Sequence, residues 1–293
     1  MLKKNIYLAL MLGCFCFAET SGSFSFLSAG TGARALALGG AFTALADDTS
    51  ALYWNPAGLV KLDIYKTHFT GMFSNMEHGR LLGYAGIYEK MENGAGSAGI
   101  SLHYFRVSGI DGRNASGFPT GDIEYNAGVL SVSYANILPA GVQAGLSLKY
   151  YYASAQDITG KGFGADLGMI CKPFGPYFSA GLTIKDINTG IIWSGGRTDY
   201  VKTLFVFGAA QSIIHEKISV SVDIESDTVL TFRYRLGSEY MVNENFALRL
   251  GINNGDLTAG FGVAYQNYII DYAFAMDNDG FADVHRFSFS AGF

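Results

Sequence analysis

The sequence is short of charged residues, of proline and of long unbroken apolar runs. Charged types make up only 15% of the chain, whereas a soluble domain usually carries about 25%. Apolar types account for 49%, yet beyond the N-terminus no stretch reaches the roughly 18 consecutive apolar residues that a membrane-spanning helix needs. A chain that is apolar on average but never for long is typical of membrane-spanning strands, in which apolar residues alternate with small or polar ones.

Basic charge and cysteine are scarce as well, and both shortages exclude classes of function. The net charge is −5 and no basic stripe is present, which argues against a nucleic-acid partner. The leader described below contains Cys14 and Cys16, so we interpret the remaining Cys171 as a packing residue and expect no disulfide framework. The histidines lack metal-ligand spacing and predict neither a metal nor a cofactor; they are His68, His78, His103, His215 and His285.

The residues that are abundant indicate strands and turns. The chain has 38 glycines, 18 tyrosines and 22 phenylalanines but only 5 prolines. Aromatic and β-branched residues favour strands, while glycine together with Asn or Asp supplies turns. The composition therefore predicts an all-β protein.

Residues 1–18 have the features of a cleaved secretory signal. Lys3 and Lys4 precede a short apolar stretch, and Ala18 supplies the small residue before the cleavage point. The stretch is too short to span a bilayer by itself. An alternative is a lipoprotein signal lipidated at Cys14, although the apolar stretch before Cys14 would then be very short. We expect the exported chain in the outer membrane of a double-membraned bacterium.

Beyond about residue 62 the sequence divides into fourteen strand-like runs separated by turn residues. Several runs alternate with a period of two; in residues 218–225, four apolar residues share one face and four polar residues share the other. The runs are residues 63–75, 80–91, 97–109, 122–137, 141–155, 162–173, 177–187, 200–213, 218–226, 230–241, 245–254, 257–266, 268–277 and 284–293.

Two features favour a membrane barrel over a soluble sandwich, whose strands also alternate. The apolar faces seldom carry a charge, and aromatic residues stand at the ends of runs, as in interfacial girdles. Long links at residues 111–121, 188–199 and 278–283 follow odd runs, as does the link at 157–161, whereas short links such as residues 139–140 follow even runs. The links after the ninth and eleventh runs are short as well, so the alternation is imperfect. Outer-membrane barrels have long outer loops and short periplasmic turns, so we expect a transmembrane antiparallel β-barrel of about 14 strands.

The last run, residues 284–293, places aromatic side chains on one face and ends in Phe293. A terminal strand that ends in phenylalanine is similar to the signal that barrel-assembly machinery recognises. We expect Phe293 to be that signal and the machinery to be a partner, together with outer-membrane lipid. The alternative is an ordinary terminal strand that ends in phenylalanine by chance.

Residues 19–62 do not have the pattern of strands. Residues 30–42 are small and apolar, and residues 48–50 predict the cap of a short helix that Asn55 and Pro56 end. A compact apolar segment ahead of the first strand suits a plug in the lumen. We therefore expect a signal peptide at 1–18, a periplasmic or lumenal segment at 19–62 and a barrel at 63–293.

The N-terminal segment also resembles a known family. Three strings within residues 32–62 carry the likeness: Gly-Gly-Ala-Phe, Ala-Asp-Asp-Thr-Ser-Ala and Trp-Asn-Pro-Ala-Gly-Leu. Together they are similar to the N-terminal signature of FadL-like outer-membrane proteins, and most similar to their PorV/PorQ-like short branch. Residues 271–274 and 285–289 resemble the same branch, while between the two ends only the strand rhythm matches.

The resemblance implies a fourteen-stranded barrel with residues 19–62 as a hatch, in which Asn55, Pro56 and Ala57, followed by Gly58, match the hatch motif. FadL-like transporters bind a hydrophobic ligand in the barrel, the hatch rearranges, and the ligand leaves sideways through the wall. PorV-like barrels serve secretion and hold protein cargo at the cell surface. We expect passive uptake of hydrophobic small molecules, such as long-chain fatty acids, with the secretion or scaffold role or a purely structural barrel as alternatives.

Charged residues on the strands are expected to face the lumen, because a charge on the lipid face costs roughly 2–4 kcal/mol at mid-bilayer. Asp223 and Glu225 share a face with Arg233 and Arg235 of the next run, and a five-residue connection places Asp223 opposite Arg233. Arg249 also faces inward. These side chains form either a site for a ligand carboxylate or an ion-pair network that braces the barrel.

The sequence contains no catalytic constellation that we recognise. Ser101 and His103 share a face, but neighbours on one strand do not make a triad without an orienting partner. Residues 94–99 superficially fit a phosphate-binding loop, yet no βαβ unit surrounds them. We therefore expect no enzymatic activity.

Overall fold

The computed structural model describes residues 24–61, 65–214, 217–276 and 283–293. The signal peptide expected at residues 1–18 and the first residues of the expected lumenal segment lie outside these ranges. Within the described residues no helix combines the length and apolar character needed to cross a membrane. The helical elements are η1 (Ser25–Ala29), α1 (Ala33–Ala37), α2 (Ala51–Trp54), η2 (Pro56–Val60), η3 (Glu92–Gly94) and η4 (Pro139–Gly141).

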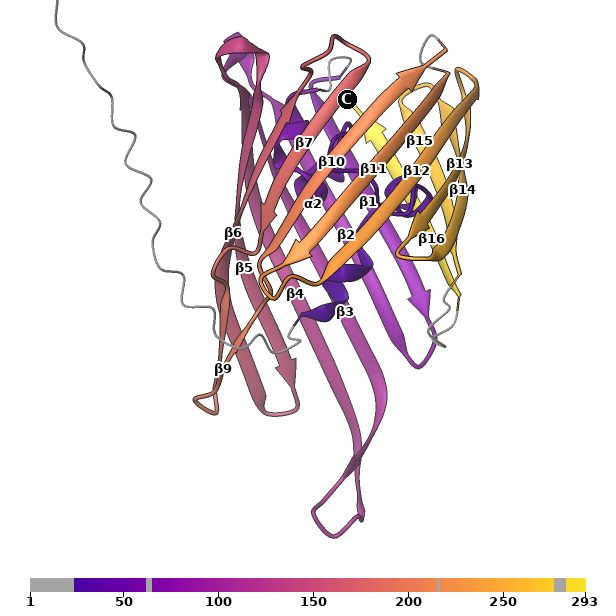
Figure 1. Cartoon of the computed structure of the whole chain (residues 1–293). Coiled ribbons are helices and arrows are strands. Elements are labelled where there is room, and N and C mark those ends of the chain that lie inside the picture. Colours follow the sequence, from indigo (N-terminus) through magenta and orange to yellow (C-terminus); the bar gives the residue numbers. More distant parts are fainter. Residues whose placement is uncertain (1–23, 62–64, 215–216, 277–282) are drawn as a thin grey trace, which may run out of the picture.

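The strands form one continuous antiparallel sheet that closes on itself (Figure 1). Closure is made by β1 and β16, whose pairing runs from His68 with Gly292 to Phe73 with Phe287. The strands are β1 (Thr67–Met76), β2 (Arg80–Lys90), β3 (Ser97–Arg113), β4 (Pro119–Ile137), β5 (Gln143–Ala155), β6 (Ile158–Cys171), β7 (Phe178–Lys185), β8 (Gly190–Trp193), β9 (Thr198–Tyr200), β10 (Leu204–Ile213), β11 (Ile218–Asp227), β12 (Phe232–Asn243), β13 (Phe246–Asn253), β14 (Asp256–Tyr265), β15 (Tyr268–Ala275) and β16 (Val284–Gly292).

Fourteen of these strands, β1–β7 and β10–β16, make the barrel wall. Each overlaps one of the fourteen runs expected from the sequence, so the predicted antiparallel barrel and its strand number are confirmed. The short strands β8 and β9 were not predicted. They form a hairpin between β7 and β10, in which β8 pairs with the first half of β6 while β7 pairs with its second half.

The wall is polar inside and apolar outside. On β11 the side chains of Val220, Val222 and Ile224 are exposed, whereas those of Asp223 and Glu225 are buried. The same inversion holds around the barrel, where the most exposed outer side chains are large and apolar, such as Phe163 (74%) and Leu250 (67%). A soluble protein buries these types, so the outer surface suits the hydrocarbon of a bilayer.

Two of the links expected from the sequence are shorter than predicted. Residues 111–121 are largely paired strand, because β3 and β4 continue to Arg113 and Pro119 and leave a turn of residues 114–118. The side chain of Asn114 caps this turn by accepting hydrogen bonds from the amides of Ser116 and Phe118, both at 3.0 Å. Polar composition suggested a loop, but the backbone ladder continues, and Figure 1 shows this hairpin projecting beyond the rest of the barrel.

The link expected at residues 157–161 is wrong for the same reason. Strand β6 already begins at Ile158, so only Gln156 and Asp157 connect β5 to β6. Gln156 has a φ of 50°, which lets the chain reverse within two residues. Both hairpins therefore extend the wall at the end of the barrel away from the C-terminus (Figure 1).

Residues 24–61 lie inside the barrel and bridge its opposite sides (Figure 1). Helix α1 packs against β14 and β15, whereas η2 packs against β4 and β5. The short helix expected between residues 50 and 55 is confirmed as α2. Glycine allows the close approach to the wall: a Cβ added at Gly251 of β13 would lie 2.2 Å from the amide nitrogen of Gly39.

Because the outer surface is apolar, a charge placed on it is expected to lower the free energy of unfolding by an amount that depends on its depth in the membrane. Leu148 is 60% exposed and lies midway along β5, so Leu148→Lys is expected to lower the free energy of unfolding by about 2–4 kcal/mol. Ile213 also faces outward but ends β10, and Ile213→Lys is expected to cost about 0–1 kcal/mol. Urea unfolding in lipid vesicles measures both changes, and equal costs would contradict a membrane band centred on Leu148.

Candidate functional site in the barrel lumen

The turn Asn55–Gly58 is tied to the rest of the N-terminal segment and to the wall. The amide of the fully buried Asn55 side chain donates to the carbonyl oxygens of Thr43 (2.9 Å) and Met169 (3.3 Å). Its Oδ1 accepts from the amide of Ala57 at 3.1 Å. One side chain thus joins α2, the loop before it and strand β6, and Pro56 starts η2 directly after it.

The turn approaches the wall where the wall has no side chains. A Cβ added at Gly168 of β6 would lie 2.1 Å from Oδ1 of Asn55, and one at Gly145 of β5 would lie 2.4 Å from the amide nitrogen of Ala57. Gly58 is equally confined, since an added Cβ would lie 1.8 Å from the carbonyl oxygen of Ala46. The geometry describes a tightly seated turn, and movement of the turn stays a prediction.

The register expected for the charged strands is wrong by two residues. Asp223 lies opposite Arg235, and Glu225 lies opposite Arg233. The strand continues to Asp227, whose Oδ1 accepts from the amides of residues 229 (3.0 Å) and 231 (2.9 Å) and so holds a tight turn. Arg233 is consequently exposed and forms no ion pair with a described residue, so the lumenal cluster does not include it.

The other predicted charges are engaged by carboxylates or amides within the lumen. Arg235 forms a buried ion pair with Glu225 at 2.7 Å. Asp223 instead accepts hydrogen bonds from the backbone amides of Phe42 (3.1 Å) and Thr43 (3.0 Å) of the N-terminal segment. The geometry therefore fits bracing of the barrel at these positions, where the sequence left a ligand site open.

Arg249 belongs to a larger network that the sequence analysis missed. Its Nε lies 2.6 Å from Oε2 of Glu239, and its Nη1 lies 2.7 Å from Oδ1 of Asp271. Glu239 also receives both Nε (3.0 Å) and Nη2 (2.9 Å) of Arg34, and Arg34 reaches Asp47 as well. The network links the N-terminal segment to β12, β13 and β15; its only sequence signal was a lone arginine in a small apolar stretch.

This network lines a cavity of about 790 Å³, which we call the terminal-end cavity because residues 290–292 contribute to it. Lys61 also lines it, and its ammonium donates to the carbonyl oxygens of Ala44 (2.8 Å) and Leu45. Burial lowers the pKa of Lys61 to about 8, and the nearby Asp47 carboxylate opposes the shift. The terminal-end cavity thus combines several charged groups with apolar side chains such as Phe69 and Phe246.

A contrasting apolar cluster fills the lumen nearer the projecting β3–β4 hairpin. Phe24 packs edge-to-face on Tyr151 at 5.2 Å between ring centroids, and Phe26 stacks on Phe105 at 5.0 Å. We call this group the aromatic chamber. Its members are Phe24, Phe26, Leu27, Met72, Leu82, Tyr84, Ala127, Val129, Tyr151, Ala153, Ile191 and Val201, with Ala29, Tyr53, Met76, Phe105, Tyr125 and Trp193 packed against it.

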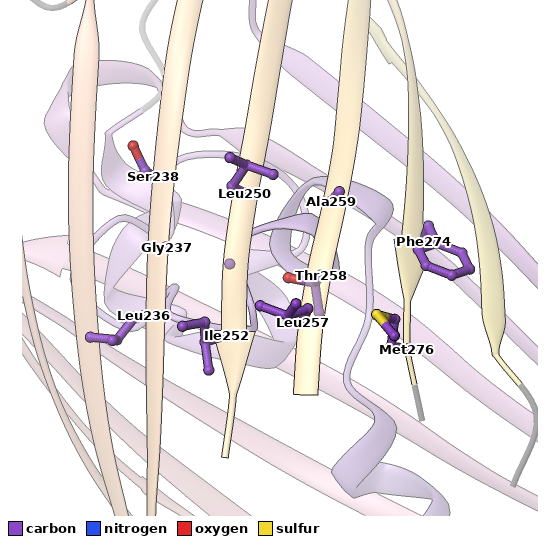
Figure 2. A pocket seen from close by; sticks show the side chains of 11 residues that line it. Leu236, Gly237, Ser238, Leu250, Ile252, Leu257, Thr258, Ala259, Phe274 and Met276 are labelled. Carbon is purple, nitrogen blue, oxygen red and sulfur yellow. The ribbon is translucent and has the colours of Figure 1, made fainter. Parts of the chain in front are cut away.

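An apolar hollow of about 500 Å³ lies on the outside of the wall over β12–β15 (Figure 2). Along one row of the sheet, small and large side chains alternate, from Ser238 through Leu250 and Ala259 to Phe274. The bulky Leu250 and Phe274 therefore flank a gap over Ala259. This hollow belongs to the lipid-facing surface, and the polar side chains among its lining residues are those of Ser238 and Thr258.

The described residues offer no group of three or more His, Cys, Asp or Glu that could hold a metal ion. Ser101 and His103 are both buried on β3, and the His103 ring packs edge-to-face on Tyr53 at 5.1 Å. Among the described residues no carboxylate hydrogen-bonds to His103. The pair therefore has no orienting acid, and the expectation that the protein is not an enzyme stays a prediction.

Solved structures with the same fold include hydrocarbon transporters. The chain matches the Ralstonia pickettii toluene transporter TbuX at a TM-score of 0.64 and 14% identity, covering 90% of this chain and 98% of the other. It matches the P. putida toluene transporter TodX at 0.62 and 13% over 90% and 99%. A Pseudomonas aeruginosa FadL homologue matches at 0.58 and 9% over 90% and 98%. At these identities the likeness establishes the fold.

The class of protein is therefore a fourteen-stranded barrel of the fold found in the FadL-type outer-membrane proteins. Within that class the chain belongs to the uncharacterised protein family UPF0164, whose model matches residues 18–169. The search of curated proteins found no match. The comparisons do not show the PorV/PorQ-like branch that the two chain ends resemble.

The seating of the Asn55–Gly58 turn can be tested at the wall. Gly168→Ala is expected to displace the turn, because the new methyl group would overlap Oδ1 of Asn55, and to expose the N-terminal segment to protease. Gly83→Ala on β2 is the matched control, since nothing lies within 4 Å of its added Cβ. Limited proteolysis of the folded barrel measures the change, and equal protection of both variants would contradict this seating.

The bracing role of Arg235 predicts a recovery by double substitution. Arg235→Met leaves Glu225 buried without its partner and is expected to lower the free energy of unfolding by about 3–5 kcal/mol. Adding Glu225→Gln removes the orphaned charge and is expected to restore most of the loss. Urea unfolding of the two variants decides the point, because a double variant as unstable as the single one would rule out the paired brace.

Proposed function

We propose that this protein is an outer-membrane barrel for the passive uptake of hydrophobic small molecules, of the size and character of long-chain fatty acids. Residues 19–62 act as a hatch that closes the lumen, and residues 63–293 form the barrel. The carrying observation is the aromatic chamber, an apolar cluster of side chains from the N-terminal segment and from a wall whose inner face is otherwise polar. A water-filled pore has no use for such a cluster, whereas a hydrophobic ligand that displaces the N-terminal segment would find an apolar surface there.

Several observations support the hatch. The segment 24–61 bridges the lumen from β4 and β5 to β14 and β15, so a molecule crossing the barrel has to displace part of it. Its contacts with the wall include the Arg34–Glu239 ion pair on one side, the close approach at Gly145 and Gly168 on the other, and the packing of Phe24 and Phe26. None of these contacts belongs to the strand ladder, so the segment can leave without unpairing any wall strand.

The structural neighbours support the class of ligand. TodX and TbuX are toluene transporters, and a third neighbour is a FadL homologue. A toluene molecule and a fatty acid share an apolar body, which is the feature that the aromatic chamber would recognise.

The location and assembly of the protein follow from the same proposal. An outer-membrane position fits the apolar outer wall, the lipid-facing hollow of Figure 2 and the signal peptide expected at residues 1–18. Phe293 follows β16 next to the closing strand, and its carbonyl oxygen accepts from the amides of Lys66 (2.9 Å) and Thr67 (3.0 Å). We propose that barrel-assembly machinery recognises this terminal strand and that the protein is not an enzyme.

The proposal predicts that the aromatic chamber holds the ligand. Ala153 is fully buried there, so Ala153→Trp overfills the cluster that a ligand would have to enter and is expected to reduce retained apolar molecules roughly tenfold, while Phe26→Ala removes a ring from the cluster and is expected to increase them. The measurement is mass spectrometry of molecules extracted from barrel refolded in a detergent unlike any lipid and then incubated with fatty acid.

The control is Ala85→Trp, which adds the same ring to an exposed position on β2. Heat-modifiable mobility on gels shows which variants have folded. An empty wild-type barrel of normal mobility would refute uptake and favour the alternative of a barrel that presents secreted protein cargo. Equal retention by Ala153→Trp and Ala85→Trp would move the ligand out of the aromatic chamber.

A further inference from the structure

The end of the barrel that carries the C-terminus contains another cavity, of about 470 Å³, which we call the basic pocket. Lys61 of the N-terminal segment lines it together with Lys90, which ends β2, and Lys172, which follows β6. Asp47 is the carboxylate among its lining residues, and its Oδ1 already lies 2.5 Å from the guanidinium of Arg34. The basic pocket therefore has an excess of positive charge, whereas the neighbouring terminal-end cavity has at least as many carboxylates as cations.

Two of these lysines are close enough to repel each other. Burial lowers the pKa of Lys61 to about 8, and the nearby charge of Lys172 contributes to this shift, which Asp47 opposes. Neither lysine forms an ion pair with a described residue. The Lys61 ammonium donates to the carbonyl oxygens of Ala44 and Leu45, so one of its three N–H groups is left for a further acceptor. Cations that repel each other across a cavity favour an anion between them.

A glycine-rich turn between β2 and β3 forms one side of the basic pocket. Gly94, Gly96 and Ser97 line the cavity, and they belong to the string at residues 94–99 whose spacing fits a phosphate-binding loop. Residues 94–96 alternate in the sign of φ, with values of 71°, −71° and 91°. Successive residues of opposite hand form concavities of backbone amides that bind anions. The amide of Ala95 already donates to the carbonyl oxygen of Glu92 at 3.2 Å, so the lysines supply most of the donors.

Gln143 gives the basic pocket a requirement that a carboxylate ligand does not meet. Its side chain lines the cavity at the start of β5, and its Oε1 is shielded from solvent without a hydrogen-bond partner. A shielded acceptor of this kind needs a donor from its ligand. A phosphate monoester has a second pKa of about 6, so near neutral pH part of the population carries an O–H beside the acceptor oxygens. An ionised carboxylate offers acceptors alone.

We propose that the basic pocket binds a free or singly esterified phosphate, with its anionic oxygens on Lys61 and Lys172 and its hydroxyl on Gln143. Lys61 belongs to the N-terminal segment, whereas the other two residues belong to the wall, so the bound phosphate bridges the two parts of the molecule. A phosphate in solution and the head of phosphatidic acid offer this same chemistry. The site is separate from the aromatic chamber, and its role goes beyond the uptake of apolar molecules.

The test follows the acylation of Lys61 by an amine-reactive reagent in the folded barrel in a non-ionic detergent, with peptide mass spectrometry as the readout. Sodium phosphate, sodium acetate and sodium chloride are compared at pH 7 and equal ionic strength. A bound anion that raises the pKa of Lys61 by about one unit lowers its neutral, reactive fraction roughly tenfold at this pH. Phosphate is therefore expected to slow the acylation about tenfold relative to chloride, and acetate is expected to have little effect.

Lys172→Gln is expected to abolish the effect of phosphate, each variant being compared with its own rate in chloride. Lys217→Gln is the matched control, because it removes an exposed lysine from the turn after β10 at the same end of the barrel, and it is expected to keep the effect. Heat-modifiable mobility shows whether both variants fold. If Lys172→Gln does not fold, the comparison of phosphate with acetate on the wild type still decides the question.

A second arm identifies the source of the phosphate. The barrel is placed in phosphatidylcholine vesicles with or without phosphatidic acid, and the acylation of Lys61 is measured again. Slowing by phosphatidic acid without slowing by dissolved phosphate assigns the site to a lipid head, and the reverse assigns it to a free phosphate. No slowing by either, equal slowing by acetate, or full slowing in folded Lys172→Gln would overturn the proposal. None of these outcomes depends on whether the aromatic chamber holds an apolar ligand.

Discussion

Hydrocarbon offers no hydrogen-bond partner to a backbone amide or carbonyl, and this constraint governs the whole molecule. A sheet in that environment has to close, because every edge strand would leave a row of unpaired groups. Pairing of β1 with β16 meets the requirement. Closure then divides the side chains into two populations, an outer one that must be apolar and an inner one that is free to be polar. The buried charges on β11 to β16 exist because the lumen is the one place where the wall can carry them.

Polar groups inside the lumen also need hydrogen-bond partners. A barrel of this width leaves polar groups facing one another across a space that water or another part of the chain must fill. The N-terminal segment fills it, and its own backbone amides at Phe42 and Thr43 find an acceptor in Asp223 of the wall. Glycines of the wall admit the segment's backbone at van der Waals distance. Wall and segment therefore satisfy each other, which is why the polar interior is compatible with a stable barrel.

The parts of this architecture that depend on local pattern could be predicted from the sequence. Period-two alternation located the fourteen wall strands, and a capping string before Asn55 located α2. The hairpin β8–β9 could not be found, because strands of four and three residues are too short to show a period. The pairing of Asp223 with Arg235 depended on where a turn ends, and the cap by Asp227 extended the strand beyond the point that composition suggested.

The lumenal site was less accessible to prediction because its pairs are distant in sequence. Arg34 and Glu239 are 205 residues apart, and nothing in either neighbourhood indicates the other. Arg286, which is 1% exposed and donates a hydrogen bond to the carbonyl oxygen of Ala29, was overlooked for a different reason. It lies between His285 and Phe287, in a run whose aromatic face favoured the interpretation as a barrel-assembly signal.

The reach of the N-terminal segment has a consequence for the order of folding. Arg34 of the segment contacts Glu239, and the amide of Ala33 donates to the hydroxyl of Ser288, 255 residues further along the chain. The carbonyl oxygen of Ala29 accepts a hydrogen bond from Arg286. The part of the chain that is synthesised first is thus completed by the strands that are synthesised last. Contacts of such long sequence separation form slowly, because the entropy of closing a long loop opposes them. The lumen can reach its final packing only when the wall is nearly whole, so the N-terminal segment is among the last parts of the barrel to settle.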